Sequence, residues 1–231
     1  MECALWRKFI QRLRDNAAMP RRDVSVYPSE KPRAALILAH GAGAGQKSAF
    51  MVAAARALSA RGVATATFDF PYMAEGRKLP DKAPVLEEAW RDAIGDVSSR
   101  ALFAGLPLFI GGKSMGGRIA SQAAAERPLP ISGLVFLGYP LHPPGKPGQR
   151  RDAHLPNIHV PMLFVQGSRD AFGTADEIRA LVPRLASATE LYEVEAGDHS
   201  FKVPARIGKP SVVMERIFDR VVAFIRSAAR S

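Results

Sequence analysis

The sequence predicts an α/β protein with a mostly parallel central sheet and helices on both faces. Short apolar runs of strand length recur along the 231 residues, and amphipathic segments of helix length separate them. This alternation is typical of parallel sheets, because a helix carries the chain back between neighbouring strands. Several of the runs end in glycine-rich or polar stretches. Ligands bind beyond the carboxyl ends of such strands, so functional residues are expected in these stretches.

The first expected element is an amphipathic basic helix over residues 1–20. Apolar side chains recur there at helical spacing, and Lys and Arg fill much of the rest. Such a helix can lie on a membrane surface or act in targeting. We prefer docking of its apolar stripe on the remainder of the protein. Residues 21–231 are then expected to form a single α/β domain.

Strands and helices are expected in a regular order after a short edge strand at residues 23–27. The run at 34–39 is continuously apolar, as in a central strand buried on both faces. Residues 138–156 are rich in Pro and Gly and too short for a helical domain, so no large cap is expected. The further predicted strands are 63–70, 106–110, 131–137, 162–166 and 190–195, and the predicted helices are 48–61, 85–103, 118–125, 175–185 and 211–229.

Composition narrows the class of protein. One cysteine, Cys3, excludes an intramolecular disulfide framework and favours a reducing compartment, and no apolar run reaches the roughly 20 residues that span a bilayer. Charges from Arg7 onward interrupt the apolar core that a secretory signal needs, so a cytoplasmic location is expected. The net charge of +10 is spread along the chain. No nucleic-acid-binding module is recognisable, and a solvated basic surface is the preferred interpretation.

Residues 112–116 read Gly-Lys-Ser-Met-Gly, a match to the G-x-S-x-G pattern between a predicted strand and a predicted helix. The chain must reverse within a few residues there, which forces a strained Ser backbone. Side chains two positions before and after Ser114 would collide, and Gly avoids this. The pattern predicts that Ser114 is a nucleophile at the top of its strand. The simpler alternative is a tight turn with a helix-capping Ser.

A glycine-rich loop, HGAGAG at residues 40–45, follows the strand at 34–39. A phosphate-binding loop is one interpretation, but Gln46 stands where that pattern needs its second Gly. The other is an oxyanion loop, whose backbone amide turns toward the nucleophile of a neighbouring strand. We assign Ala42 as the amide donor, with Gly43 as the alternative. His40 is expected to shape this loop by hydrogen bonding.

Two more polar residues follow predicted strands and complete a hydrolytic set. A Ser hydroxyl needs a base to take its proton, and His199 can serve as that base near neutral pH. Asp170 would hold the imidazole tautomer and stabilise the imidazolium. The amide of Met115 would bind the oxyanion together with that of Ala42, with each donor contributing roughly 3–4 kcal/mol. The order Ser, Asp, His along the chain is that of the α/β-hydrolases.

Other residues compete for these roles. Asp198 adjoins His199, but sequence neighbours on a loop usually point apart, and Asp69 is a weaker rival for the acid. His142 is the one serious substitute base, and it could instead bind substrate. Tyr72 and Tyr139 are expected beside it as pocket residues. No metal or other cofactor is expected, since the His residues lack ligand spacing and there is one Cys.

Four motifs together carry a resemblance to a known family. After the N-terminal segment, the chain resembles an α/β-hydrolase over its whole length, and within that superfamily the dienelactone-hydrolase-like branch. More narrowly, it resembles a group of predicted hydrolases that includes a testis-expressed protein and a subunit of the nonspecific-lethal histone acetyltransferase complex. Dienelactone hydrolases proper carry Cys at the position of Ser114, so their substrate is not carried over. The motifs are HGAGAG (40–45), GGKSMGGR (111–118), GYPLHPPG (138–145) and GDHSF (197–201).

The sequence therefore predicts a serine hydrolase that cleaves a small-molecule ester or thioester through an acyl-enzyme. The alternative is a catalytically silent interaction or scaffold domain of the same fold. A nucleotide-binding module that uses the glycine-rich loop and Lys47 is a third interpretation, which Gln46 disfavours because it breaks the phosphate-loop pattern. Basic residues close to Ser114 favour acidic substrates; they are Lys113, Arg118 and Arg169.

Overall fold

A computed structural model describes residues 23–230 of the chain. Seven strands form one sheet, in which the edge strand β1 runs antiparallel to β3 and all other neighbours are parallel. The mostly parallel sheet predicted from the sequence is confirmed. In spatial order the strands are β1 (Val24–Tyr27), β3 (Val63–Phe68), β2 (Ala34–Ala39), β4 (Leu108–Lys113), β5 (Gly133–Leu137), β6 (Met162–Gly167) and β7 (Thr189–Val194).

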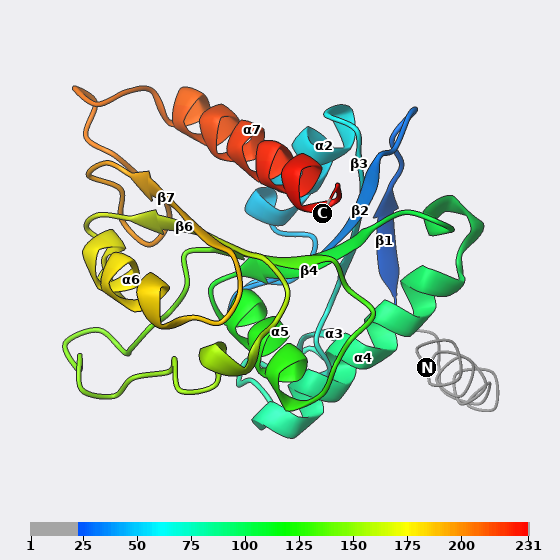
Figure 1. Cartoon of the computed structure of the whole chain (residues 1–231), viewed down its shortest axis with the longest axis horizontal. Helices are drawn as coiled ribbons and strands as arrows, with labels where there is room; N and C mark the ends of the chain where they lie inside the picture. Colours follow the sequence, from blue (N-terminus) through cyan, green and yellow to red (C-terminus); the bar gives the residue numbers. More distant parts are fainter. Residues whose placement is uncertain (1–22, 231) are drawn as a thin grey trace.

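Helices cover both faces of the sheet (Figure 1). On one face lie α2 (Ala49–Ala60) and α7 (Pro210–Ala228), whose apolar side chains form one core cluster. The opposite face carries the other core cluster. It contains side chains from α3 (Pro71–Ala74), α4 (Ala83–Ser99), α5 (Met115–Glu126) and α6 (Ala175–Leu181).

The central strand β2 shows why the fold needs two layers of helices. All of its residues are buried. Leu36 and Leu38 belong to the α2–α7 core, whereas Ala35 and Ile37 belong to the core on the other face. Successive side chains of a strand point to opposite faces, so a continuously apolar strand requires cover on both.

Several element boundaries differ from those expected. β4 continues through Gly111 and Gly112, where it pairs with both β2 and β5, instead of ending at Ile110. α4 stops at Ser99 instead of continuing to Phe103, and a 3-10 turn, η1 (Ala101–Phe103), follows. Pro183 removes a backbone donor, so α6 gives way to the 3-10 turn η3 (Val182–Arg184).

Between β5 and β6 the chain runs as a loop whose one regular element is the 3-10 turn η2 (Leu155–Asn157). Within residues 23–230, no large cap covers the carboxyl ends of the strands, as expected. The predicted helix at residues 1–20 lies outside the described residues. Among residues 23–230, no helix is both long and apolar enough to cross a bilayer.

Candidate active site

Ser114 occupies a strained turn between β4 and α5. Its backbone has φ 51° and ψ −117°, a positive φ that non-glycine residues rarely adopt. The flanking glycines are required by the neighbouring backbone. A Cβ on Gly112 would lie 2.1 Å from the carbonyl oxygen of Ala39, and a Cβ on Gly116 would lie 2.3 Å from the same atom. The collision expected from the spacing is therefore with β2.

The Ser114 side chain does not cap α5. Its Oγ instead lies 2.9 Å from Nε2 of His199, and Nδ1 of His199 lies 2.7 Å from Oδ2 of Asp170. A neutral imidazole that donates from Nδ1 to the carboxylate accepts the Ser114 hydroxyl at Nε2. The structure thus brings together Ser114, Asp170 and His199, the three residues expected from the sequence, which follow β4, β6 and β7.

Asp170 is 1% exposed and is held by more than its histidine. Its Oδ1 accepts the Phe172 amide at 2.8 Å, and its Oδ2 accepts Nε2 of Gln166 at 3.0 Å. Gln166 is itself fully buried, and its Oε1 accepts the Tyr139 amide at 2.8 Å. Sequence reasoning missed Gln166. The sequence feature that could have identified Gln166 is its position as a polar residue at the end of an otherwise apolar strand.

The rival carboxylates are engaged elsewhere. Oδ1 of Asp198 accepts the amides of Ser200 and Lys202 at 2.8 and 2.9 Å, which closes the turn that carries His199. Asp69 accepts the Gln46 amide at 2.7 Å and so supports the glycine-rich loop. Of the three candidates, Asp170 is the one that hydrogen-bonds His199.

The glycine-rich loop lies directly beside Ser114. A Cβ on Gly41 would contact Cβ of Ser114 at 3.4 Å, and Ala42 lines the same cavity as Ser114 and Met115. Met115 is the first residue of α5, where helix amides lack partners within the helix. The amides of Ala42 and Met115 are thus candidates for binding an oxyanion at this position.

His40 shapes that loop, as expected. Its ring lies between the Gly41 carbonyl, 2.9 Å from Nδ1, and the Phe70 amide, which donates to Nε2 at 3.1 Å. Burial lowers the pKa of His40, although the Gly41 carbonyl and Asp69 oppose this. One donor and one acceptor contact define a neutral imidazole protonated at Nδ1.

Lys113 supports the histidine loop instead of facing the cavity. Its ammonium donates to the His199 carbonyl at 2.6 Å and lies 5.4 Å from the centre of the Phe201 ring. Burial lowers the pKa of Lys113 to about 8, against the raising effect of Asp170 and Asp198. Lys113 therefore holds the backbone of His199 in place.

A cavity of about 320 Å³ opens beside Ser114. Phe172 and Arg151 are among the lining residues that sequence reasoning missed, because their positions depend on contacts with residues distant in sequence. The Phe172 ring packs against the His199 imidazole with centroids 4.3 Å apart. The lining consists of Ala42, Pro80, Asp81, Ala83, Leu86, Ser114, Met115, Arg118, Ile119, Pro140, Arg151 and Phe172.

Three expected pocket residues do not line this cavity, which corrects their placement. Tyr72 and Tyr139 are buried in the core, and the Tyr139 hydroxyl donates to the Arg151 carbonyl at 2.7 Å. His142 is also buried, with Nδ1 2.9 Å from the Pro143 carbonyl and Nε2 3.1 Å from Glu177. Tyr139 and His142 hydrogen-bond other protein groups, whereas the Tyr72 ring lies 6.0 Å from the His40 ring and its buried hydroxyl has no hydrogen-bond partner among the described residues.

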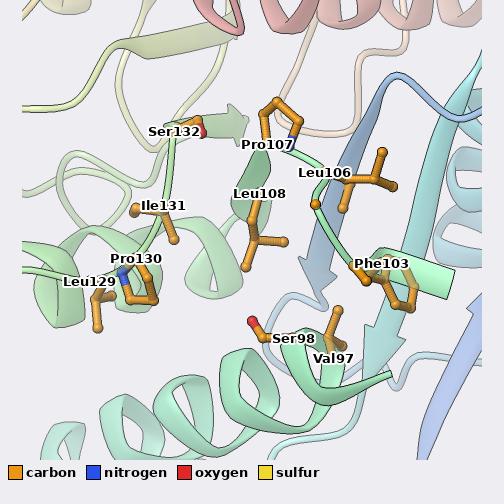
Figure 2. A pocket seen from close by; sticks show the side chains of 13 residues that line it. Val97, Ser98, Phe103, Leu106, Pro107, Leu108, Leu129, Pro130, Ile131 and Ser132 are labelled. Atoms are coloured by element: carbon orange, nitrogen blue, oxygen red, sulfur yellow. The ribbon is translucent and has the colours of Figure 1, made fainter. Parts of the chain in front are cut away.

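A second cavity, of about 530 Å³, opens at the amino-terminal edge of the sheet (Figure 2). Apolar side chains such as Val97 and Leu108 dominate its lining, and Ser98 and Ser132 supply its polar side chains. It contains no acid–base pair. Across the described part of the chain, no cluster of His, Cys, Asp or Glu is placed to hold a metal ion.

Solved structures with the same fold include several hydrolases. A dienelactone hydrolase from Anabaena variabilis superposes with a TM-score of 0.71 at 20% identity, covering 88% of this chain and 90% of that one. Est1E from Butyrivibrio proteoclasticus, solved with ferulic acid bound, has a TM-score of 0.70 at 14% identity and covers 88% and 95%. At these identities the likeness concerns the fold.

A curated relative is a putative phosphoribosyl transferase of Mycobacterium tuberculosis, 28% identical over 182 residues. The match covers 77% of this chain but 39% of the relative, so the chain spans well under half of that protein. Residues 32–226 match the model of a family described as an alpha/beta hydrolase domain. That range includes Ser114, Asp170, His199 and the glycine-rich loop, and the chain belongs to the α/β-hydrolase family.

Proposed function

We propose that the protein is a serine hydrolase that cleaves carboxylic esters or thioesters through an acyl-enzyme. One observation carries this proposal: a continuous line of hydrogen bonds from Ser114 through His199 to Asp170, at a strained turn that opens on a cavity. Ser114 is the nucleophile, His199 the base and Asp170 the residue that orients the base.

Acylation begins when Oγ of Ser114 attacks the substrate carbonyl carbon. Nε2 of His199 takes the hydroxyl proton as the bond forms, and Asp170 stabilises the imidazolium. The carbonyl oxygen becomes an oxyanion, which accepts hydrogen bonds from the amides of Ala42 and Met115. The tetrahedral intermediate then expels the alcohol or thiol, which takes its proton from His199. The acyl group remains esterified to Ser114.

Deacylation repeats these steps with water. His199 takes a proton from a water molecule, whose oxygen attacks the acyl carbon, and the same amides bind the second oxyanion. Collapse of that intermediate returns the proton from His199 to Ser114 Oγ and releases the carboxylic acid. The open carboxyl edge of the sheet, with no large cap, leaves room for water to reach the acyl group.

The nucleotide-binding interpretation has no comparable support. Gln46 is fully buried, with Nε2 donating to the Asp23 carbonyl at 2.8 Å, so it joins the loop to β1. Lys47 is exposed and lies 4.0 Å from the Asp23 carboxylate, on the protein surface. The name of the mycobacterial relative describes a protein much longer than the matched region.

Covalent labelling with a fluorophosphonate tests the proposal. We expect one adduct per chain, located on Ser114 by peptide mapping, absent in Ser114→Ala and slowed in His199→Ala. Ser98→Ala, in the cavity at the opposite sheet edge, serves as the matched control and should label like the parent protein. A folded parent protein that takes up no label contradicts the proposal. The alternative, a catalytically silent interaction domain, would then be favoured.

A further inference from the structure

Two arginines face the same cavity as Ser114. Arg118 lies on α5, four residues after Ser114, and Arg151 comes from the loop after β5. Both side chains are half-buried. The cavity beside the nucleophile therefore carries two positive charges from separate parts of the chain.

Neither guanidinium has a carboxylate partner among residues 23–230. Nη1 of Arg118 donates to Oε1 of Gln122 at 2.9 Å, while its Nε is buried and has no hydrogen-bond partner there. Arg91, on the adjacent α4, is different, because it pairs with both Glu88 and Glu126. A partly buried guanidinium without a counter-ion is costly, so this site is suited to an anion from outside.

The one carboxylate in the cavity lining, Asp81, is already in use. Its Oδ1 lies 2.8 Å from Arg77, and its Oδ2 accepts the Tyr72 amide at 3.0 Å. Burial lowers the pKa of Arg118, and the charge of Arg151 lowers it further, against the opposite effects of Tyr139 and Glu87. The positive charge of Arg151 is therefore close enough to Arg118 to lower its pKa.

The backbones of both arginines are fixed by buried groups. The carbonyl of Arg151 accepts the Tyr139 hydroxyl at 2.7 Å, and its amide donates to the Leu141 carbonyl at 2.8 Å. The carbonyl of Arg118 accepts the Ser121 hydroxyl at 2.7 Å. The anchoring hydroxyl of Tyr139 explains why a residue expected to contact substrate lies in the core instead.

We propose that Arg118 and Arg151 bind a carboxylate carried by the substrate, so that the substrates are monoesters or monothioesters of short dicarboxylic acids. This inference rests on the proposed function for its reaction. Arg118 is the fourth residue of α5, and at 1.5 Å per residue its backbone lies roughly 6 Å along the helix direction from Ser114, which directly precedes the helix. That spacing suits two or three methylenes between the scissile carbonyl and the carboxylate. The planar guanidinium fork matches a carboxylate better than it matches an uncharged group.

Two isosteric substrates test the inference. Monoethyl succinate carries the carboxylate, and ethyl 4-methylpentanoate replaces its two oxygens by methyl groups. We expect a kcat/KM for the succinate ester at least tenfold higher. Arg118→Gln or Arg151→Gln should lower that value by roughly 10- to 100-fold, the range for hydrogen bonds to charged groups, and should lower the ratio of kcat/KM for the succinate ester to that for the neutral ester at least tenfold. Arg127→Gln, exposed at the far end of α5, is the matched control.

Binding without turnover separates this inference from the proposed function. Calorimetry with the Ser114→Ala protein should detect monoethyl succinate, and adding Arg118→Gln or Arg151→Gln should weaken its Kd at least tenfold. Inorganic phosphate should bind more weakly, and tighter phosphate binding would overturn the choice of a carboxylate. Fluorophosphonate labelling of Ser114 without preference for the succinate ester overturns this inference alone. Binding of monoethyl succinate by a protein that takes up no label overturns the proposed function alone.

Discussion

The two sides of the cavity differ in how completely the protein satisfies its own polar groups. On the reacting side (Ser114, His199 and Asp170), hydrogen bonds of 2.7 and 2.9 Å join the side chains. On the arginine side (Arg118 and Arg151), no carboxylate within residues 23–230 pairs with either guanidinium. A completed network holds groups in position, whereas an unpaired charge leaves a contact for a ligand to complete.

The two sides are also built differently. The reacting side depends on close backbone contact between β2, β4 and the start of α5, where glycines permit the approach. The arginine side depends on side-chain hydrogen bonds, from Tyr139 to the Arg151 carbonyl and from Ser121 to the Arg118 carbonyl. Substitutions on the reacting side should therefore abolish turnover or folding. Substitutions on the arginine side should alter the preference for anionic substrates or the pH dependence of stability.

The largest expected effect is on the reacting side. His199→Ala removes the base, and kcat for an activated ester should fall about 10⁴-fold while KM changes little. The His199 side chain is 20% exposed, so Tm should change by only a few degrees. The exposed His159→Ala is the control. Steady-state kinetics that show less than a tenfold loss of kcat would remove His199 from the proposed mechanism.

Gly116→Ala tests the backbone contact beneath the nucleophile. The added Cβ would lie 2.3 Å from the Ala39 carbonyl oxygen and 2.7 Å from that of His40, so β2 or α5 must move. We expect the free energy of unfolding in urea to fall by about 3 kcal/mol. Gly148→Ala meets no atom within 4 Å and should lie within about 0.5 kcal/mol of the parent protein. Equal stability of the two variants would contradict the packing account.

Gln166→Leu tests the buried support of Asp170. It leaves the Tyr139 amide and the Gly173 carbonyl without their partner, since Nε2 of Gln166 lies 2.6 Å from that carbonyl. The free energy of unfolding should fall by about 2–3 kcal/mol relative to the parent protein. The kcat should also fall, because Asp170 loses a hydrogen bond. The exposed Gln149→Leu is the matched control. A stability loss with unchanged kcat would show that Gln166 supports the fold without positioning Asp170.

Local patterns were sufficient for most of the fold. Apolar runs identified the strands, and the G-x-S-x-G spacing identified the turn at Ser114, because each depends on neighbours in sequence. The positions of Asp170 and His199 followed from a general property of parallel sheets, whose carboxyl ends lie at one edge. These expectations needed no knowledge of side-chain direction.

Side-chain direction explains the sequence-based errors. Tyr72, Tyr139 and His142 do follow strands, yet their side chains are buried without lining the cavity, and those of Tyr139 and His142 hydrogen-bond other groups. Arg151 and Gln166 were missed because their roles depend on contacts with residues distant in sequence. Position along the chain thus identified the correct edge of the sheet, the carboxyl edge. It did not identify which side chains line the cavity there.

The smallest expected effect is a pH response on the arginine side. Nε2 of His154 lies 2.7 Å from Oγ of Ser121, which anchors the Arg118 carbonyl. Burial lowers the pKa of His154 to about 4, and the Arg118 charge lowers it further, against the opposing effect of Asp152. Between pH 6.5 and 4 the unfolded chain therefore binds a proton that the folded chain does not, so stability falls as pH falls.

His154→Gln should remove that dependence. From pH 7.5 to pH 5 the parent protein should lose about 2 kcal/mol more unfolding free energy than the variant, as measured by urea titration at each pH. The exposed His159→Gln should follow the parent protein. In the Ser114→Ala background, which does not turn the ester over, saturating monoethyl succinate should reduce the difference, because a carboxylate between the arginines offsets the charge that opposes protonation of His154. A difference that monoethyl succinate leaves unchanged would place the bound anion away from Arg118, and the arginine side would then lose its assigned role.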